Sequence, residues 1–224
     1  MARRGGEEQA AAWNEALGPR AAVMPGTGAL FNAGERQHSI YTVRGGCLKT
    51  YTVDADGNER IRGFFLPGDV IGLDSLGSSV HLASAAAISP SQVCVTPLSA
   101  LRRAAVQQPL LAQRLLEQTS RDLALALTLS GAFNAEQRIA AFLLHMRSRM
   151  GTGNVLRLPM GQREIGNYLR LATETVCRTL KGFERRGWLS QGAHTIRLLN
   201  DQGLGELATA VGIVEPAPEL ARAA

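Results

Sequence analysis

The first half of the chain contains short apolar runs that are typical of β-strands. Within residues 29–95, stretches rich in β-branched and aromatic residues are separated by glycines and by Pro67-Gly68. Residues 40–53 are followed by turn residues at 54–57 and by a second apolar stretch at 60–66, which predicts a hairpin. The spacing favours a small β-sandwich or barrel over strands that alternate with helices.

The apolar period changes after Pro109, a residue that suits the first turn of a helix. Small residues and leucines then recur at spacings of three and four until Gly131, which predicts a helix of about 20 residues. The stripe consists of Ala112, Leu116, Thr119, Leu123, Ala126, Leu127 and Ser130. It can pack on the β-domain of its own chain or on the same helix of a second copy in a parallel pair.

A further helix is predicted to begin at Asn134, which can cap it because Gln137 follows three positions later. Its apolar face comprises Ile139, Phe142, Leu143 and Met146. Residues 151–154 predict a loop after it.

Residues 162–180 have the pattern of a helix-turn-helix. Ile165 and Leu169 form the apolar side of a first helix, and after a short turn Val176 and Leu180 form that of a second. The polar residues of the second helix are thereby forced outward, as in a recognition helix that enters the major groove of DNA. An amphipathic helix pair whose charges only face water would show the same pattern.

The start of this second helix carries side chains that can read bases. Arg178 can donate two hydrogen bonds to guanine O6 and N7, and Glu174 can accept one from cytosine N4. The remaining expected contacts are Thr173, Thr175 and Cys177 alongside the bases and, at phosphates, Gln162 and Arg163.

The residues after the motif extend it to a winged helix-turn-helix. Phe183, Trp188 and Leu189 are predicted core residues, and residues 190–199 predict a small hairpin that turns at Gly192. The whole segment is basic, because residues 157–197 contain eight Lys and Arg against three Asp and Glu, a net charge of +5. Such a block is typical of a module that binds polyanions, although a solvated basic face has the same count.

Composition limits the class of protein further. With 224 residues, 45% of them hydrophobic and 19% charged, the chain is globular and forms one large domain or two small ones. No apolar run of about 18 residues occurs, so no membrane span is expected. The polar residues 5–9 stand where a secretory signal would need an apolar core, so we expect a cytoplasmic protein. Neither the three cysteines nor the four histidines have metal-binding spacing, so no metal site is expected.

At this point the sequence resembles the Crp/Fnr family of bacterial transcription regulators over residues 29–199, and most closely its Fnr-like branch. The resemblance is carried by residues 40–46 and 63–72, and above all by Glu164-Ile165-Gly166-Asn167-Tyr168-Leu169 followed by Glu174-Thr175-Val176-Cys177-Arg178. It implies an α+β fold in three parts, which are a cyclic-nucleotide-binding-type β-roll at 1–108, a long dimerisation helix at 109–133 and a winged helix-turn-helix at 134–224. It also implies a homodimer without enzymatic activity that binds a two-fold symmetric, TTGAT-like DNA site, with RNA polymerase as a partner.

Two effector sites of the family are incomplete in this sequence. Members that bind cyclic AMP hold its phosphate with an Arg that follows an acidic residue. Here Asp69 stands at the acidic place, but no Lys or Arg occurs between Arg62 and Arg102. We expect no cyclic-nucleotide binding, because a buried phosphate without a cation is costly. Oxygen-sensing members hold an iron-sulfur cluster with N-terminal cysteines, and residues 1–46 contain none, so we expect neither a cluster nor another cofactor.

Two further differences concern the dimer and the DNA. Ala126 stands where the oxygen sensors have an acid that opposes dimerisation, so we expect a dimer that does not depend on oxygen. Cys177 replaces the Ser of the Fnr-type reading pattern. Because a thiol is a weaker hydrogen-bond partner than a hydroxyl, this replacement affects recognition of the outer thymines and leaves the central G·C contact unchanged. Cys177 is either a tolerated small residue or, near a helix N-terminus and beside Arg178, a redox switch.

Two other functions are the alternatives. The first is a ligand-sensing β-roll module whose helical tail acts only through protein–protein contacts; such a module would not need the basic block at residues 157–197. An enzyme of cupin type would need clustered metal ligands, which this sequence lacks.

Overall fold

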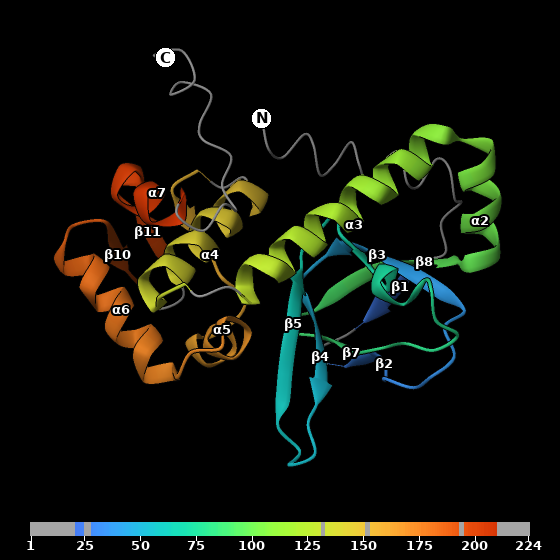
Figure 1. Ribbon diagram of the computed structural model, residues 1–224, viewed down its shortest axis with the longest axis horizontal. Helices are drawn as coiled ribbons and strands as arrows, with labels where there is room; N and C mark the ends of the chain where they lie inside the picture. The colour runs from blue at the N-terminus through green and yellow to red at the C-terminus, as the bar shows by residue number, and fades with distance from the viewer. Residues whose placement is uncertain (1–20, 25–27, 131–132, 151–152, 193–194, 210–224) are drawn as a thin grey trace. The chain divides into compact units, whose positions relative to one another are not determined.

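The chain divides into two compact units, residues 1–120 and 121–224, and the boundary lies within the long helix α3 (Pro109–Ser130). The structure is a computed structural model (Figure 1) that describes residues 21–24, 28–130, 133–150, 153–192 and 195–209, with only the backbone at 21–24, 121–122 and 124–130. Helix α3 confirms the predicted helix from Pro109. The three-part division into 1–108, 109–133 and 134–224 stays a prediction, and Gly131 lies outside the described residues.

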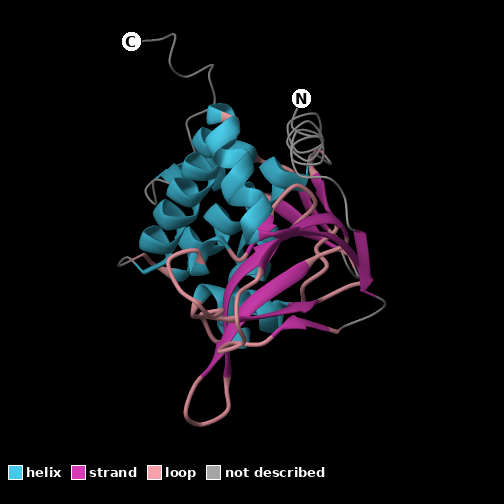
Figure 2. Cartoon of the chain, turned by 90° about the vertical axis from the view of Figure 1, so that its right-hand side faces the viewer, coloured by secondary structure: helices cyan, strands magenta, loops and turns pink. Residues whose placement is uncertain are grey.

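The N-terminal unit contains two four-stranded antiparallel sheets, shown as magenta arrows in Figure 2. The first has the order β1-β8-β3-β6 and comprises β1 (Ala21–Met24), β8 (Ser91–Pro97), β3 (Ser39–Gly45) and β6 (Val70–Ile71). The second has the order β2-β7-β4-β5 and comprises β2 (Ala29–Phe31), β7 (Ser84–Ala87), β4 (Leu48–Val53) and β5 (Glu59–Phe65). A 3-10 turn, η1 (Leu73–Ser75), follows β6. The predicted all-β domain is therefore confirmed.

Apolar residues of both sheets form the core of this unit. The cluster comprises Phe31, Val43, Leu48, Ile71, Ala85, Ala87 and Val93. A second cluster joins β3, β6 and η1 to two helices through Leu101 and Ala104 of α2 (Leu98–Gln107) and Leu111 of α3. The helix α2 was not predicted, although Leu98, Leu101 and Ala104 recur every three residues on its buried side.

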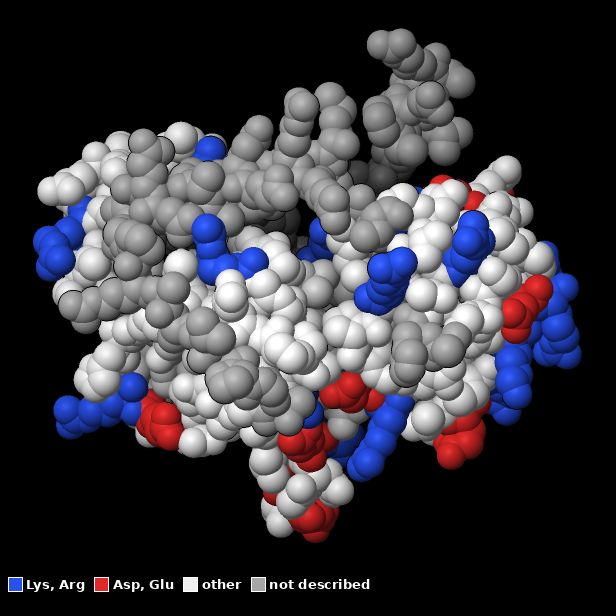
Figure 3. All heavy atoms as spheres, turned by 180° about the vertical axis from the view of Figure 1, so that it is seen from behind, with Lys and Arg blue, Asp and Glu red and all other residues white. Residues whose placement is uncertain are grey.

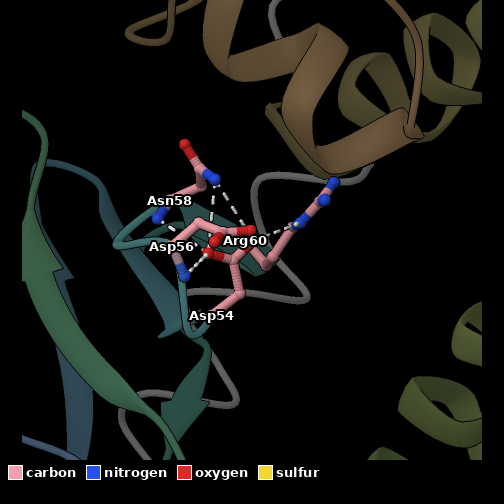
Figure 4. A network of polar contacts seen from close by, with 4 residues as sticks. All are labelled: Asp54, Asp56, Asn58 and Arg60. Carbon is pink, nitrogen blue, oxygen red and sulfur yellow. Dashed lines mark hydrogen bonds and ion pairs between the residues drawn. The ribbon is translucent and has the colours of Figure 1, made fainter.

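The hairpin of β4 and β5 extends past the other strands (Figures 1 and 2). Its turn is organised by Asp54, whose Oδ1 accepts the backbone N–H of Asp56 at 3.1 Å and of Asn58 at 2.9 Å (Figure 4). Arg60 lies beside this carboxylate, with Nε 3.6 Å from Oδ2. The hydrogen bond from the Asn58 backbone is the main cause of the lowered pKa of Asp54. The predicted hairpin is confirmed, together with the turn chemistry on which it depended.

The C-terminal unit consists of short helices and a small sheet. Its elements are α4 (Ala135–Met150), β9 (Val155–Leu156), α5 (Gln162–Leu169), α6 (Thr173–Arg185), β10 (Leu189–Gln191), β11 (Ile196–Leu198) and α7 (Asp201–Thr209). The cap predicted for α4 is present, because Asn134 and Gln137 exchange hydrogen bonds of 2.9 and 3.0 Å between side chain and backbone. The three strands pair in the order β10-β11-β9. The elements β9 and α7 were not predicted; α7 packs on α4, where Arg147 forms an ion pair with Asp201.

None of the helices in the described part of the chain combines the length and the apolar character that a membrane span needs. The α+β class is confirmed, with a β-sheet domain first, helices next and a helix-turn-helix at the C-terminal end.

Candidate nucleic-acid interface

The helices α5 and α6 form the helix-turn-helix that the pattern predicted. Ile165, Leu169, Val176 and Leu180 are between 0 and 4% exposed and form its buried side. The turn between the helices is closed by Leu171, whose N–H donates to the carbonyl of Gly166 at 2.8 Å. Arg170 adopts the left-handed conformation there (φ 56°, ψ 45°), which lets the chain change direction within three residues.

Two arginine contacts join this motif to α4. Arg138 of α4 donates through Nη1 to the carbonyl of Leu169 at 3.1 Å, so it caps the end of α5. At the far end of α6, Arg186 forms a bidentate ion pair with Glu136 at 2.7 and 3.0 Å. The pair lowers the pKa of Glu136, chiefly through the hydrogen bond that Arg186 donates. Both contacts hold the recognition helix on the domain, and both were missed in the sequence because their partners are 31 and 50 residues apart.

The outer face of α6 presents charged side chains to solvent. Both predicted base-reading residues, Glu174 and Arg178, are exposed. A shallow hollow runs along this face and is lined by Thr173, Glu174, Cys177, Arg178, Lys181, Glu184 and Arg185. Lys181 and Arg185 were not among the predicted contacts, although they continue the spacing of Glu174 and Arg178 along one side of the helix. Figure 3 shows one face of the molecule, on which Lys and Arg side chains lie interspersed with Asp and Glu.

The other predicted contacts lie around this face. Arg163 is exposed at the start of α5, and Thr173 and Thr175 are half-buried in the first turn of α6. Gln162 and Cys177 meet directly, because the Cys177 thiol donates to Oε1 of Gln162 at 2.6 Å. The structure thus brings Gln162 to the recognition helix, and contact of Gln162 and Arg163 with phosphates stays a prediction.

The wing lies beside α6. Leu189 pairs with Leu198 and Gln191 with Ile196 across the predicted hairpin, whose residues 193 and 194 lie outside the described residues. Gln191 is held against α6 by Glu184, which accepts its backbone N–H at 2.9 Å and its side-chain Nε2 at 3.3 Å. Of the predicted core, Phe183 and Leu189 are buried, and Trp188 packs on Phe183 with ring centroids 5.5 Å apart. The expected winged helix-turn-helix is therefore present.

The stripe predicted on α3 is largely exposed in its described part. Leu116 is 71% exposed, Leu123 is 59% exposed and Thr119 is also exposed, whereas the buried leucine of this helix, Leu111, lies outside the stripe. Ala112 is half-buried. The side chains of Ala126, Leu127 and Ser130 lie outside the described residues. The described part of the stripe thus leaves large apolar side chains uncovered in the single chain.

That the N-terminal unit binds neither a cyclic nucleotide nor an iron-sulfur cluster stays a prediction. The Asp69 carboxylate accepts the backbone N–H of Leu66 at 2.6 Å, so it stabilises a turn. The last basic residue before Asp69 is Arg62, whose Nη1 lies 3.9 Å from Oδ2 of Asp74. The next basic residue in the sequence is Arg102. An iron-sulfur cluster needs four thiolates, and no group of metal-binding side chains gathers among the described residues.

Comparisons with known proteins agree with this architecture. Residues 25–108 match the family model of the cyclic nucleotide-binding domain, and residues 137–207 match that of the Crp-like helix-turn-helix domain. The transcriptional regulatory protein btr of Bordetella pertussis is 38% identical over 187 residues, which cover 80% of this chain and 76% of that protein. The fumarate and nitrate reduction regulatory protein of Escherichia coli is 36% identical over 187 residues, with 80% and 74% covered.

The solved structure of FixK2 from Bradyrhizobium japonicum has the same fold. It is 33% identical in sequence and superposes with a TM-score of 0.79 over 90% of this chain and 100% of that one. Together with the geometry of α5, α6 and the wing, these similarities confirm the resemblance seen in the sequence. The chain belongs to the Crp/Fnr family of transcription regulators and carries the helix-turn-helix DNA-binding domain of that family.

Proposed function

We propose that the protein regulates transcription as a homodimer that binds a two-fold symmetric DNA site with TTGAT-like half-sites. The observation that carries this proposal is the exposed face of α6, where Glu174 and Arg178 lie one turn apart with Lys181 and Arg185 after them. Arg178 can read guanine and Glu174 the opposite cytosine in the major groove. The exposed Arg163 supplies a cation for the backbone beside the groove.

The proposed site can be tested by fluorescence anisotropy with the full chain in air and without added ligand. We expect tight binding to a TTGAT-N4-ATCAA palindrome and weaker binding to a TGTGA-type palindrome and to a scrambled duplex. The affinity should fall steeply with salt, because bound Lys and Arg release counterions from the phosphates. Equal and weak binding to all three duplexes would contradict the proposal, and binding without salt dependence would favour the protein–protein module.

The same assay tests the redox hypothesis for Cys177. A thiol switch predicts that oxidation changes the affinity of the wild type but not of Cys177→Ser. If both proteins bind equally well under reducing and oxidising conditions, Cys177 is no switch.

The homodimer is proposed from the uncovered leucines of α3. Leu116 and Leu123 lie two turns apart on one side of the helix and are 71% and 59% exposed. Side chains of this size on a helical stripe gain stability when they pack on the same stripe of a second copy. The dimer in turn places two recognition helices on the two halves of a symmetric site.

Replacing Leu116 with glutamate is expected to convert the dimer to a monomer at micromolar concentration. The substitution places a charge inside the apolar seam, whereas the fold of the single chain loses little because the side chain is exposed. Gln118→Glu is the matched control, since it adds a negative charge to the same helix on the side away from Leu116 and Leu123. Light scattering measures the mass; a wild type that is already monomeric there would refute the proposed dimer.

We further propose RNA polymerase as the partner of the DNA-bound dimer, on the basis of the family resemblance. A supershift of the protein–DNA complex by purified polymerase tests it, with a duplex lacking the TTGAT half-sites as the control.

A further inference from the structure

A chain of side-chain hydrogen bonds leads from α6 across the wing and α5 back to the recognition face of α6. It begins at Glu184 of α6, continues through Gln191 of β10 and Gln162 of α5, and ends at the thiol of Cys177. Its links measure 3.3 Å (Gln191 Nε2 to Glu184 Oε2), 3.5 Å (Gln162 Nε2 to Gln191 Oε1) and 2.6 Å (Cys177 Sγ to Gln162 Oε1). Two elements outside the recognition helix thus reach one of its predicted base-contacting residues.

The direction of each hydrogen bond in this chain follows from its first member. An ionised carboxylate only accepts hydrogen bonds, so Gln191 must turn its amide NH₂ toward Glu184. Its Oε1 is then left to accept from Nε2 of Gln162. The Oε1 of Gln162 consequently faces Cys177, where it needs a donor, and the thiol hydrogen is the donor that Cys177 possesses.

This arrangement determines what Cys177 can offer to DNA. The residue lines the same hollow as Glu174 and Arg178, so it belongs to the face that carries the base-reading groups. Its single hydrogen is already bound to Gln162, and the sulfur that remains is a polarizable group with apolar character and weak accepting power. Among the base edges in the major groove, thymine presents an apolar group, its 5-methyl.

We propose that Cys177 reads a thymine 5-methyl group through its sulfur, and that Gln162 is the positioning residue that holds the thiol hydrogen away from the DNA. This inference rests on the proposed DNA-binding function and deepens it. It gives Gln162 a role other than the predicted phosphate contact, which then falls to Arg163. Gln191 and Glu184 support Gln162 in this role because they fix the orientation of its amide.

The test replaces each outer thymine of one TTGAT half-site with deoxyuridine, which removes only the methyl group. For the wild type, one of these replacements should lower the affinity about fourfold, the value expected for one buried methyl group. In Cys177→Ser the serine hydroxyl can still donate to Gln162 but offers no sulfur, so the ratio of thymine to uracil affinity should fall close to one.

Two variants of Gln162 test the positioning role through the same ratio. Gln162→Leu removes the acceptor and frees the thiol hydrogen, so the thymine-to-uracil ratio should also fall toward one. Gln162→Glu keeps an acceptor and should keep the ratio near four, even though its negative charge weakens binding to every duplex. Circular dichroism of each variant checks that the domain is folded.

The outcomes separate this inference from the function on which it rests. If the wild type binds the TTGAT palindrome no better than the scrambled duplex, the proposed function fails and the inference fails with it. If it prefers the palindrome but tolerates uracil at both outer positions, the methyl contact alone is refuted. If the thymine-to-uracil affinity ratio is unchanged in Cys177→Ser, another residue makes the methyl contact. If the ratio is unchanged in Gln162→Leu, Gln162 does not position the thiol.

Discussion

Replacing Arg178 with alanine is expected to weaken binding to the TTGAT palindrome by about 5- to 150-fold per half-site, whereas binding to random DNA changes far less. The guanidinium lies exposed on the outer face of α6, where it can donate two parallel hydrogen bonds to guanine O6 and N7. Such a bidentate contact contributes about 1–3 kcal/mol of discrimination. Fluorescence anisotropy on the palindrome, on a variant with the central G·C pair replaced, and on scrambled DNA measures the loss and the relaxed specificity.

Arg163→Ala is the matched control for this experiment. It removes the same positive charge from the same motif, at the start of α5, where it is also exposed. A phosphate contact carries no sequence information, so Arg163→Ala should weaken the binding of every duplex alike and reduce the slope of the salt dependence by about one per half-site. If Arg178→Ala lowers the affinity for specific and for random DNA equally, Arg178 does not read a base.

The sequence predicted the local elements of the DNA-binding domain well because their signals are local. The apolar spacing of Ile165, Leu169, Val176 and Leu180 identifies the buried sides of two short helices, and all four side chains are buried. The helix cap at Asn134 and the turn at Asp54 also depend on partners within four residues. In each case the residues that decide the structure are neighbours in the chain.

Contacts between distant segments escaped prediction. Arg138 reaches the carbonyl of Leu169, and Gln162 reaches both Cys177 and Gln191. Arginine and glutamine at these positions are equally compatible with solvent exposure, so only the packing of α4, α5 and β10 reveals their partners. The strand β9 was missed for a related reason, since two residues carry no period and become a strand only by pairing with β11.

The residues of the candidate site could be predicted from the sequence, but one contact between them could not. Glu174 and Arg178 could be chosen from the sequence because helical spacing places them opposite Val176 and Leu180. The sequence also placed Cys177 on this face, but the bond that uses its thiol hydrogen depends on the amide of Gln162, 15 residues earlier. The chemistry that Cys177 presents is therefore a property of the fold rather than of the residue alone.

Replacing Gly166 with alanine is expected to destabilise the C-terminal unit by about 1–3 kcal/mol and to weaken binding to every duplex, specific or random. A Cβ at this position would lie 2.7 Å from the carbonyl oxygen of Leu171 and 3.4 Å from Cγ2 of Val176. The backbone cannot retreat without cost, because the N–H of Leu171 donates to the carbonyl of Gly166 at 2.8 Å and closes the turn. Alanine is the better helix former by about 1 kcal/mol, but this gain is smaller than the cost of separating α5 from the start of α6.

Gly182→Ala distinguishes this steric effect from the general consequence of adding a methyl group to the motif. Gly182 lies within α6, and a Cβ there would meet no atom within 4 Å. Its replacement should therefore leave the stability unchanged or raise it by up to about 1 kcal/mol, with DNA binding intact. Urea unfolding followed by circular dichroism measures both variants. If Gly166→Ala unfolds at the wild-type urea concentration and binds the palindrome normally, the close approach of α5 to the turn does not set the geometry of the recognition helix.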